Sequence, residues 1–142
     1  MGGAPRAFQL PGLPIGTARI SPDGKFILYN TLDVNNPQAR PRTNVISIDG
    51  GPVLYSFERM NGQTFGGSWA PDGHAIDFGM TRGGITDIWR RPLPAGEPKQ
   101  LTHFPSGLIN AYSWSNDGKT LFVARGPRTF DIVLLKSSKK SQ

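Results

Sequence analysis

Cysteine is absent from all 142 residues, and this absence excludes disulfide bonds and metal sites built on thiolates. The sequence also lacks an apolar run long enough to cross a bilayer, and no stretch after Met1 resembles a signal peptide, so membrane insertion is not expected. No segment keeps the apolar period of a helix, which predicts almost no helix. By contrast, 18 glycines and 13 prolines are spread along the chain, as in proteins built of short strands and turns.

The motifs that usually carry catalysis are missing as well. The sequence contains no Gly-x-Ser-x-Gly, no His-Glu-x-x-His, no phosphate-binding glycine-rich loop followed by Lys-Ser/Thr, and no cysteine nucleophile. The two histidines, His74 and His103, are separated in a way that makes no zinc site, and no metal or cofactor is predicted. We therefore expect that this chain is not an enzyme.

A longer phrase that contains Asp-Gly occurs three times. Its turn residues are Asp23, Gly24, Asp72, Gly73, Asp117 and Gly118, and the aspartates are spaced by 49 and 45 positions. Asp-Gly between apolar segments predicts a hairpin turn, because glycine accepts a positive φ and aspartate hydrogen-bonds the local backbone. A calcium site is the less favoured reading, since calcium loops need several oxygen ligands at close spacing. The repeat therefore describes architecture rather than chemistry.

Each phrase sits inside a longer unit of four predicted strands. The first strands end at Ile20, Trp69 and Trp114, and the second strands are Phe26–Leu32, Ala75–Met80 and Thr120–Arg125. The third strands are 44–48, 87–90 and 131–135, and the fourth strands, after a Gly/Pro turn, are 53–57 and 99–102. Four short antiparallel strands per repeat of this length predict an all-β fold made of β-propeller blades.

The predicted organisation is a three-blade segment over residues 1–135, followed by a disordered basic tail over 136–142. The blades are expected at 16–58, 64–103 and 109–135, and the last one lacks its outer strand. Residues 1–10 match the turn and outer strand of a blade, because Pro5, Pro52 and Pro98 are spaced by 47 and 46 positions. The outer strand of one blade is therefore predicted at the N-terminus.

Ser21–Lys25 and Trp114–Lys119, with Asp87-Ile88-Trp89 and Gln100-Leu101-Thr102, resemble the WD40-like repeat of TolB-type β-propellers over about residues 2–135. The second copy departs from the pattern, with Ala70 for serine and His74 for lysine. The resemblance implies a module for protein interaction or gating. Similar blades occur in periplasmic TolB, beside prolyl-oligopeptidase-type catalytic domains, and in bacterial kinases and regulators. A periplasmic location is favoured by this resemblance alone.

Closure of the ring is a physical problem, because three blades cannot form a closed propeller and would leave sheet edges exposed. One solution is a homodimer, in which the strand around residues 6–10 completes the third blade of a second copy and makes a six-bladed ring. A solution mass near the 15.4 kDa of one chain would contradict the dimer. The other interpretation, compatible with the first, is that the chain is a fragment of a longer propeller protein.

An arginine-bearing loop face is the candidate binding surface. Sorting the charges by propeller topology assigns to this face Arg19, Arg40, Arg42, Arg59, Arg82, Arg125 and Arg128. Arginine binds carboxylate or phosphate through two hydrogen bonds, which indicates an anion-seeking surface. The alternative, favoured here, is that these are ordinary solvated loop residues paired with nearby acids. The long loop 33–42 lies on the same face and is either a recognition loop or a tolerated insertion.

Three functions remain after these exclusions. The first is a non-catalytic scaffold that binds a protein or peptide. The second is the substrate-access propeller of a larger serine hydrolase, or part of a signalling protein. The third is binding of an anionic ligand or nucleic acid through the arginine face. It ranks last, and nucleic acid is the less favoured partner, because aromatic residues other than Phe65 and Phe130 do not alternate with the arginines. The net charge of +6 is weak support for this third function, since three of the lysines lie in the predicted tail.

Overall fold

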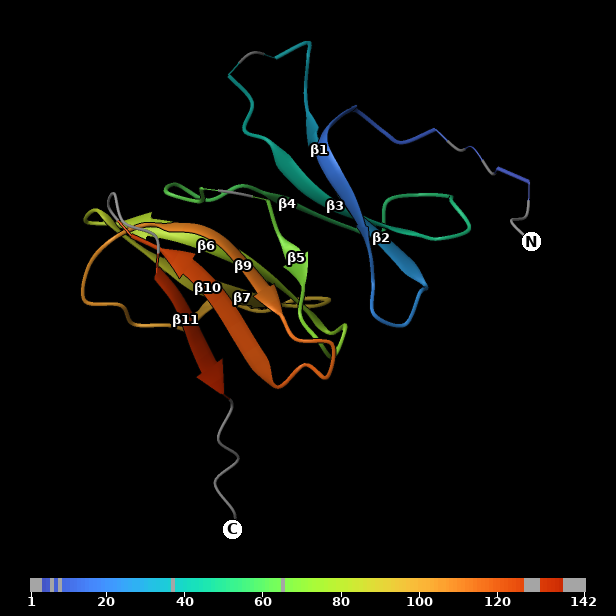
Figure 1. Ribbon diagram of the computed structural model, residues 1–142. Coiled ribbons are helices and arrows are strands. Elements are labelled where there is room, and N and C mark those ends of the chain that lie inside the picture. Colours follow the sequence, from blue (N-terminus) through green and yellow to red (C-terminus); the bar gives the residue numbers. More distant parts are fainter. Residues whose placement is uncertain are drawn as a thin grey trace. The chain divides into compact units, whose positions relative to one another are not determined.

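The computed structural model describes residues 4–5, 7, 9–36, 38–64, 66–126 and 131–136, the last six by their backbone alone. This part of the chain contains strands and turns and no helix, so no helix there could cross a membrane (Figure 1). The chain divides into two compact units, Met1–Arg59 and Met60–Gln142. The all-β fold predicted from the sequence is confirmed.

The first unit is one antiparallel sheet with the strand order β1-β2-β3-β4 (Figure 1). Its strands are β1 (Leu13–Ile20), β2 (Phe26–Leu32), β3 (Arg42–Ser47) and β4 (Tyr55–Glu58). Consecutive residues in the middle of β2 and β3 are apolar and buried, namely Leu28, Tyr29, Val45 and Ile46. Each strand pairs with the next one along the chain, which is the topology of a propeller blade.

The second unit contains two antiparallel sheets. The four-stranded sheet is β5 (Ser68–Trp69), β6 (Ala75–Arg82), β7 (Ile85–Pro92) and β8 (Lys99–Gln100), in that order. The other sheet has the order β11-β10-β9, from β9 (Ile109–Trp114), β10 (Thr120–Arg125) and β11 (Asp131–Lys136). Ile88 of β7 packs with Ile109, Leu121 and Val123, so one apolar core joins the two sheets.

The three Asp-Gly turns have the same geometry in all three copies. The glycine φ angles are 73°, 73° and 68° at Gly24, Gly73 and Gly118. Each of these glycine N–H groups donates to the carbonyl three residues earlier at 2.9 Å. The strand ends predicted at Ile20, Trp69 and Trp114 are confirmed, and two second strands have the predicted bounds. Local turn chemistry therefore determines where these strands begin and end.

Two of these turns carry an additional hydrogen bond. The Ser21 hydroxyl donates to Asp23 at 2.6 Å, and the Ser115 hydroxyl donates to Asp117 at 2.5 Å. Chiefly because of these bonds, the pKa of each carboxyl lies below its ordinary value of 3.8. The second copy has Ala70 at this position, and Asp72 accepts the His74 N–H.

The lowered pKa values predict an acid-sensitive contribution to stability. Since each folded-state pKa lies below the unfolded value, both carboxylates stabilise the fold above that value, and the contribution is lost as the pH falls through the folded pKa. In an NMR titration of the carboxyl carbons, Ser21→Ala is expected to raise the pKa of Asp23 and leave Asp117 unchanged. Ser115→Ala should do the reverse. Identical titration of Asp23 with and without the Ser21 hydroxyl would contradict this prediction.

Some predicted positions are corrected by the pairing. Arg19 lies within β1 and Arg42 begins β3, so neither is in a loop. The segment 81–86, expected to be a loop, is mostly strand, because pairing of β6 with β7 continues to Arg82 and Ile85. Gly83 and Gly84 alone make the turn, with φ angles of 56° and 78° that suit a tight two-residue hairpin.

The ends of the chain are only partly described. Lys136 was expected in the tail but ends β11, where it pairs with Thr120. The remainder of the predicted tail, 137–142, lies outside the described residues, as does much of the predicted N-terminal strand. The described residues between 4 and 10 are in no strand of this single chain, and β11 is at the edge of its sheet. The exchanged-strand homodimer remains a prediction.

Candidate binding pocket in the second unit

An open pocket of about 480 Å³ lies where several connecting segments of the second unit meet. The segment before β5, the facing ends of β6 and β7, and the start of β9 all contribute to it. Its lining residues are Gly62, Gln63, Thr64, Thr81, Thr86, Leu108, Ile109 and Asn110. The lining combines hydroxyl and amide groups with aliphatic side chains and carries no formal charge. Propeller topology places these segments on the loop face where the sequence located its candidate site.

One wall is built by backbone pairing beside Gly62. The Thr81 N–H donates to the Gly62 carbonyl at 2.7 Å, and the Thr64 N–H donates to the Gly79 carbonyl at 3.1 Å. Gly62 has a φ of 81°, and a Cβ added there would lie 2.4 Å from the Thr81 carbonyl oxygen. Glycine is therefore required at this position, because the chain approaches β6 more closely than any side chain permits.

The base of the pocket holds two paired hydroxyl groups. The Oγ1 atoms of Thr81 and Thr86, which face each other across β6 and β7, are 2.7 Å apart. One hydroxyl donates to the other, so the second proton is available to an acceptor in the pocket. The Thr86 N–H donates to the Gly107 carbonyl at 3.0 Å and holds the opposite wall near this pair.

The opposite wall is positioned by the buried carboxylate of Asp87. Asp87 Oδ1 accepts the Thr102 hydroxyl at 2.7 Å and the Phe104 N–H at 3.0 Å, while Oδ2 accepts the Gln100 amide at 3.0 Å. The Gly126 N–H then donates to the Leu108 carbonyl at 3.0 Å. Asp87 thus anchors the β8–β9 segment that presents the pocket-lining residues. In the sequence, Asp87 is only the first residue of a predicted third strand, and nothing there indicates this role.

Two arginines of the predicted binding face, Arg82 and Arg125, stack on aromatic rings in the second unit. The Arg82 guanidinium lies 4.3 Å from the centre of the Trp89 ring, and that of Arg125 lies 4.1 Å from the centre of the Phe104 ring. Arg125 also donates to the Ser106 carbonyl. Cation–π stacking of this kind covers one face of each guanidinium. Arg128 lies outside the described residues.

In the first unit, the arginines of the predicted binding face are distributed over strands and loops. Arg42 donates to Ser56 Oγ at 2.8 Å and to Glu58 at 3.2 Å. Arg19 and Arg40 are exposed, and the Arg59 N–H donates to the Pro41 carbonyl at 2.9 Å. Within the described residues, no group of three metal-binding side chains is present.

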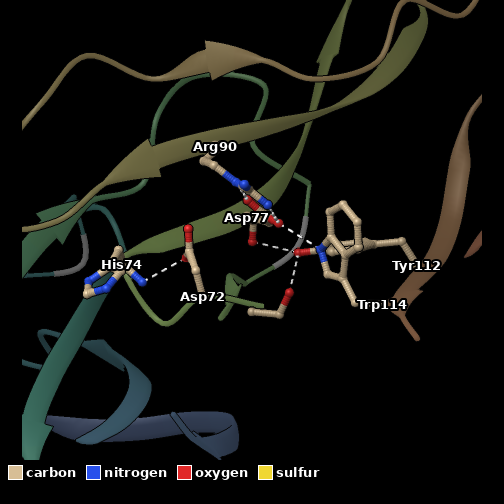
Figure 2. Close-up of polar contacts among 7 residues, drawn as sticks. Asp72, His74, Asp77, Arg90, Tyr112 and Trp114 are labelled. Atoms are coloured by element: carbon tan, nitrogen blue, oxygen red, sulfur yellow. Dashed lines mark hydrogen bonds and ion pairs between the residues drawn. The ribbon is translucent and has the colours of Figure 1, made fainter. Parts of the chain in front are cut away.

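A buried carboxylate, Asp77, connects the two sheets of the second unit (Figure 2). It is fully buried and accepts Arg90 Nε at 2.7 Å and Nη2 at 2.9 Å. It also accepts the Trp114 indole N–H at 2.8 Å, while its carbonyl accepts the Tyr112 hydroxyl at 2.6 Å. The bond to Asp77 raises the pKa of Arg90, with burial acting in the opposite direction.

In the sequence, Asp77 is only one position of a predicted second strand. An available signal was an acidic residue inside the otherwise apolar strand Ala75–Met80, which is uncommon without a charged partner. Trp114, which ends a predicted first strand, packs against the core that joins the sheets. The identity of the partners Arg90 and Trp114 depends on strand register and on the packing of two sheets.

Comparison with known proteins establishes the class of fold. No protein-family model and no curated protein sequence matches this chain. Among solved structures it is similar to TolB from Acinetobacter baumannii, with 23% identity and a TM-score of 0.61 over 89% of this chain and 30% of that one. A putative TolB from Agrobacterium tumefaciens matches with 22% identity and a TM-score of 0.66, over 89% of this chain and 47% of that one.

A prolyl endopeptidase structure is also similar, with 21% identity and a TM-score of 0.64 over 89% of this chain and 21% of that protein. These likenesses, together with the blade topology of the sheets, define a β-propeller fold. More narrowly, the fold is that of TolB-like β-propellers, as the repeat phrase predicted. The chain spans less than half the length of each of these three proteins.

Proposed function

We propose that this chain is a non-catalytic β-propeller scaffold that binds a protein or peptide segment through the pocket of the second unit. The observation that carries the proposal is the uncharged lining, in which threonine hydroxyls and the Asn110 amide lie beside Leu108 and Ile109. Backbone amides and aliphatic side chains of a peptide match such groups, because they need hydrogen bonds and apolar contact but no counter-charge. The stacked positions of Arg82 and Arg125 support this proposal over an anion site.

A peptide-display selection tests the proposal with a matched pair of variants. Leu108 lines the pocket and its side chain is 44% exposed, whereas Leu101 is 38% exposed and lies outside the lining. Peptides selected on the wild-type protein should bind Leu108→Asp at least about tenfold more weakly, the effect of about 1.4 kcal/mol. Leu101→Asp should bind them as the wild type does. Equal weakening by both variants, or failure to select any peptide, would count against the proposal.

The second candidate function is the propeller of a larger hydrolase, favoured by the likeness to a prolyl endopeptidase. In that case the same pocket would contact a substrate peptide and another domain would carry the catalytic residues. The discriminating observation is the sequence that adjoins this segment in its gene, where a hydrolase requires a serine nucleophile with a histidine base. An anionic-ligand site would instead show binding that weakens strongly as salt increases.

A further inference from the structure

A second cavity, of about 430 Å³, lies entirely in the first unit and is separate from the proposed peptide pocket. It is formed at the end of the sheet where β1 begins, β2 ends and β3 begins. Its lining residues are Pro11, Gly12, Leu13, Thr31, Leu32, Asp33, Val34, Asn35, Arg42, Asn44, Val53 and Ser56. Nothing in the scaffold function described above uses these groups.

A directed chain of hydrogen bonds crosses this cavity lining from strand to strand. Arg42 Nε donates to Ser56 Oγ at 2.8 Å, and the Ser56 hydroxyl donates to Asn44 Oδ1 at 2.7 Å. The Asn44 amide in turn donates to Thr31 Oγ1 at 2.9 Å. Asn44 lies opposite Ser56, and Arg42 lies opposite Thr31, so these side chains share one face of the sheet.

This series of hydrogen bonds ends at the Thr31 hydroxyl, whose proton has no acceptor among the described residues. Thr31 is only 7% exposed, and its oxygen already accepts the Asn44 amide, so its own O–H is left to donate. A buried donor without an acceptor is unfavourable, and buried polar groups in native structures normally have partners. Gly12 closes over this residue: a Cβ there would lie 3.2 Å from Thr31 Cβ. Thr31 lines the cavity, so an acceptor bound there could reach this hydroxyl.

The walls around this donor are largely aliphatic, and Arg42, the one cation among the lining residues, already has a counter-ion. Leu13, Val34 and Val53 present apolar surface to the cavity, and Val34 is 64% exposed. Arg42 is paired with Glu58, and Asp33 accepts the Asn35 N–H. A ligand that fits these groups has a carbonyl oxygen next to an aliphatic group and carries no net charge.

We propose that this cavity binds an uncharged ligand of that kind, with its carbonyl oxygen accepting the Thr31 hydroxyl and its aliphatic group packed on Leu13 and Val34. The chemistry is that of an amide-blocked aliphatic amino acid. The site would give the domain a second point of contact with a ligand, independent of the pocket lined by Leu108. Loss of binding at one site therefore leaves the other measurable.

The probe for this site is N-acetyl-leucinamide, titrated into the full ¹⁵N-labelled chain and followed by amide chemical shifts. Saturable shifts are expected at Thr31, Leu32 and Asn44. N-acetyl-glycinamide, which lacks the aliphatic group, should bind more weakly, and so should N-acetyl-leucine, whose carboxylate is charged. Tighter binding of the carboxylate, or an absence of saturable shifts, would overturn the proposal.

Matched variants separate recognition from folding. Thr31→Val removes the donor and should weaken binding of N-acetyl-leucinamide about tenfold, the loss of one buried hydrogen bond. Thr43→Val is the control, since Thr43 is equally buried but lies on the opposite face and donates to Asn30 at 2.9 Å. Val34→Asp changes an exposed wall residue, so it should fold normally and also weaken binding. Unchanged binding by both Thr31→Val and Val34→Asp would overturn the proposal.

Discussion

Replacement of Asp77 by alanine is expected to lower the free energy of unfolding of the second unit by about 3–5 kcal/mol, the usual effect of removing one partner of a buried ion pair. Asp77 is fully buried and its carboxylate accepts three donors, two from Arg90 and one from Trp114. In the variant, the Arg90 guanidinium, which is 27% exposed, loses its counter-ion, and the Trp114 indole N–H loses its acceptor. Both losses fall at the junction of the two sheets, so the whole unit is expected to be less stable.

Urea denaturation followed by tryptophan fluorescence measures this loss directly, since Trp69, Trp89 and Trp114 all lie in the second unit. The control is Glu97→Ala, which removes an exposed carboxylate in the β7–β8 turn and should change stability by less than about 0.5 kcal/mol. If Asp77→Ala were as mild as Glu97→Ala, the assignment of the carboxylate as the link between the sheets would be wrong.

Replacement of Gly62 by alanine is expected to destabilise the second unit by about 3 kcal/mol and to abolish peptide binding in its pocket. Two effects add: a positive φ costs an alanine about 1–2 kcal/mol, and overpacking costs about 1–3 kcal/mol. The second effect arises because the new Cβ would lie 2.4 Å from the Thr81 carbonyl oxygen, which is backbone and cannot rotate away. The segment 62–64 must then separate from β6, and that pairing forms one wall of the pocket.

Gly83→Ala separates the clash from the backbone strain. Gly83 also has a positive φ, 56°, but an added Cβ meets no atom within 4 Å. Gly83→Ala should therefore lower the free energy of unfolding by the backbone strain alone, about 1–2 kcal/mol, and should retain peptide binding. Denaturation midpoints and binding of the selected peptides are measured for both variants. Equal effects of the two substitutions would show that close approach at Gly62 does not shape the pocket.

Much of the fold is predictable from the sequence because its determinants are local. The Asp-Gly turns place the ends of β1, β5 and β9, and the short apolar segments after these turns predict the strands that follow. Where prediction was wrong, pairing between strands had extended a strand into an expected loop, as at Arg42 and around Gly83. Two glycines are enough to connect β6 and β7, so no longer loop is needed between these strands. The repeat pattern of a propeller does not by itself predict so short a connection.

The candidate sites were much less predictable. Propeller topology directed attention to the connecting segments, but the arginines chosen there are stacked or paired in three described cases, Arg42, Arg82 and Arg125. The pocket is lined instead by threonines and amides that have no distinctive motif. Asp87 was predicted only as the start of a strand, yet it is a buried anchor for the pocket wall.

The sequence alone is enough to predict short antiparallel strands in three repeats, because turn residues and short apolar segments act within a few residues of one another. Only the tertiary structure decided which polar groups are satisfied within the protein and which remain available. The partners of Asp77 come from β7 and β9. The Thr31 hydroxyl, whose proton has no acceptor among the described residues, ends a series of hydrogen bonds that begins at Arg42. Such partners are far apart in sequence, and strand register and sheet packing bring them together.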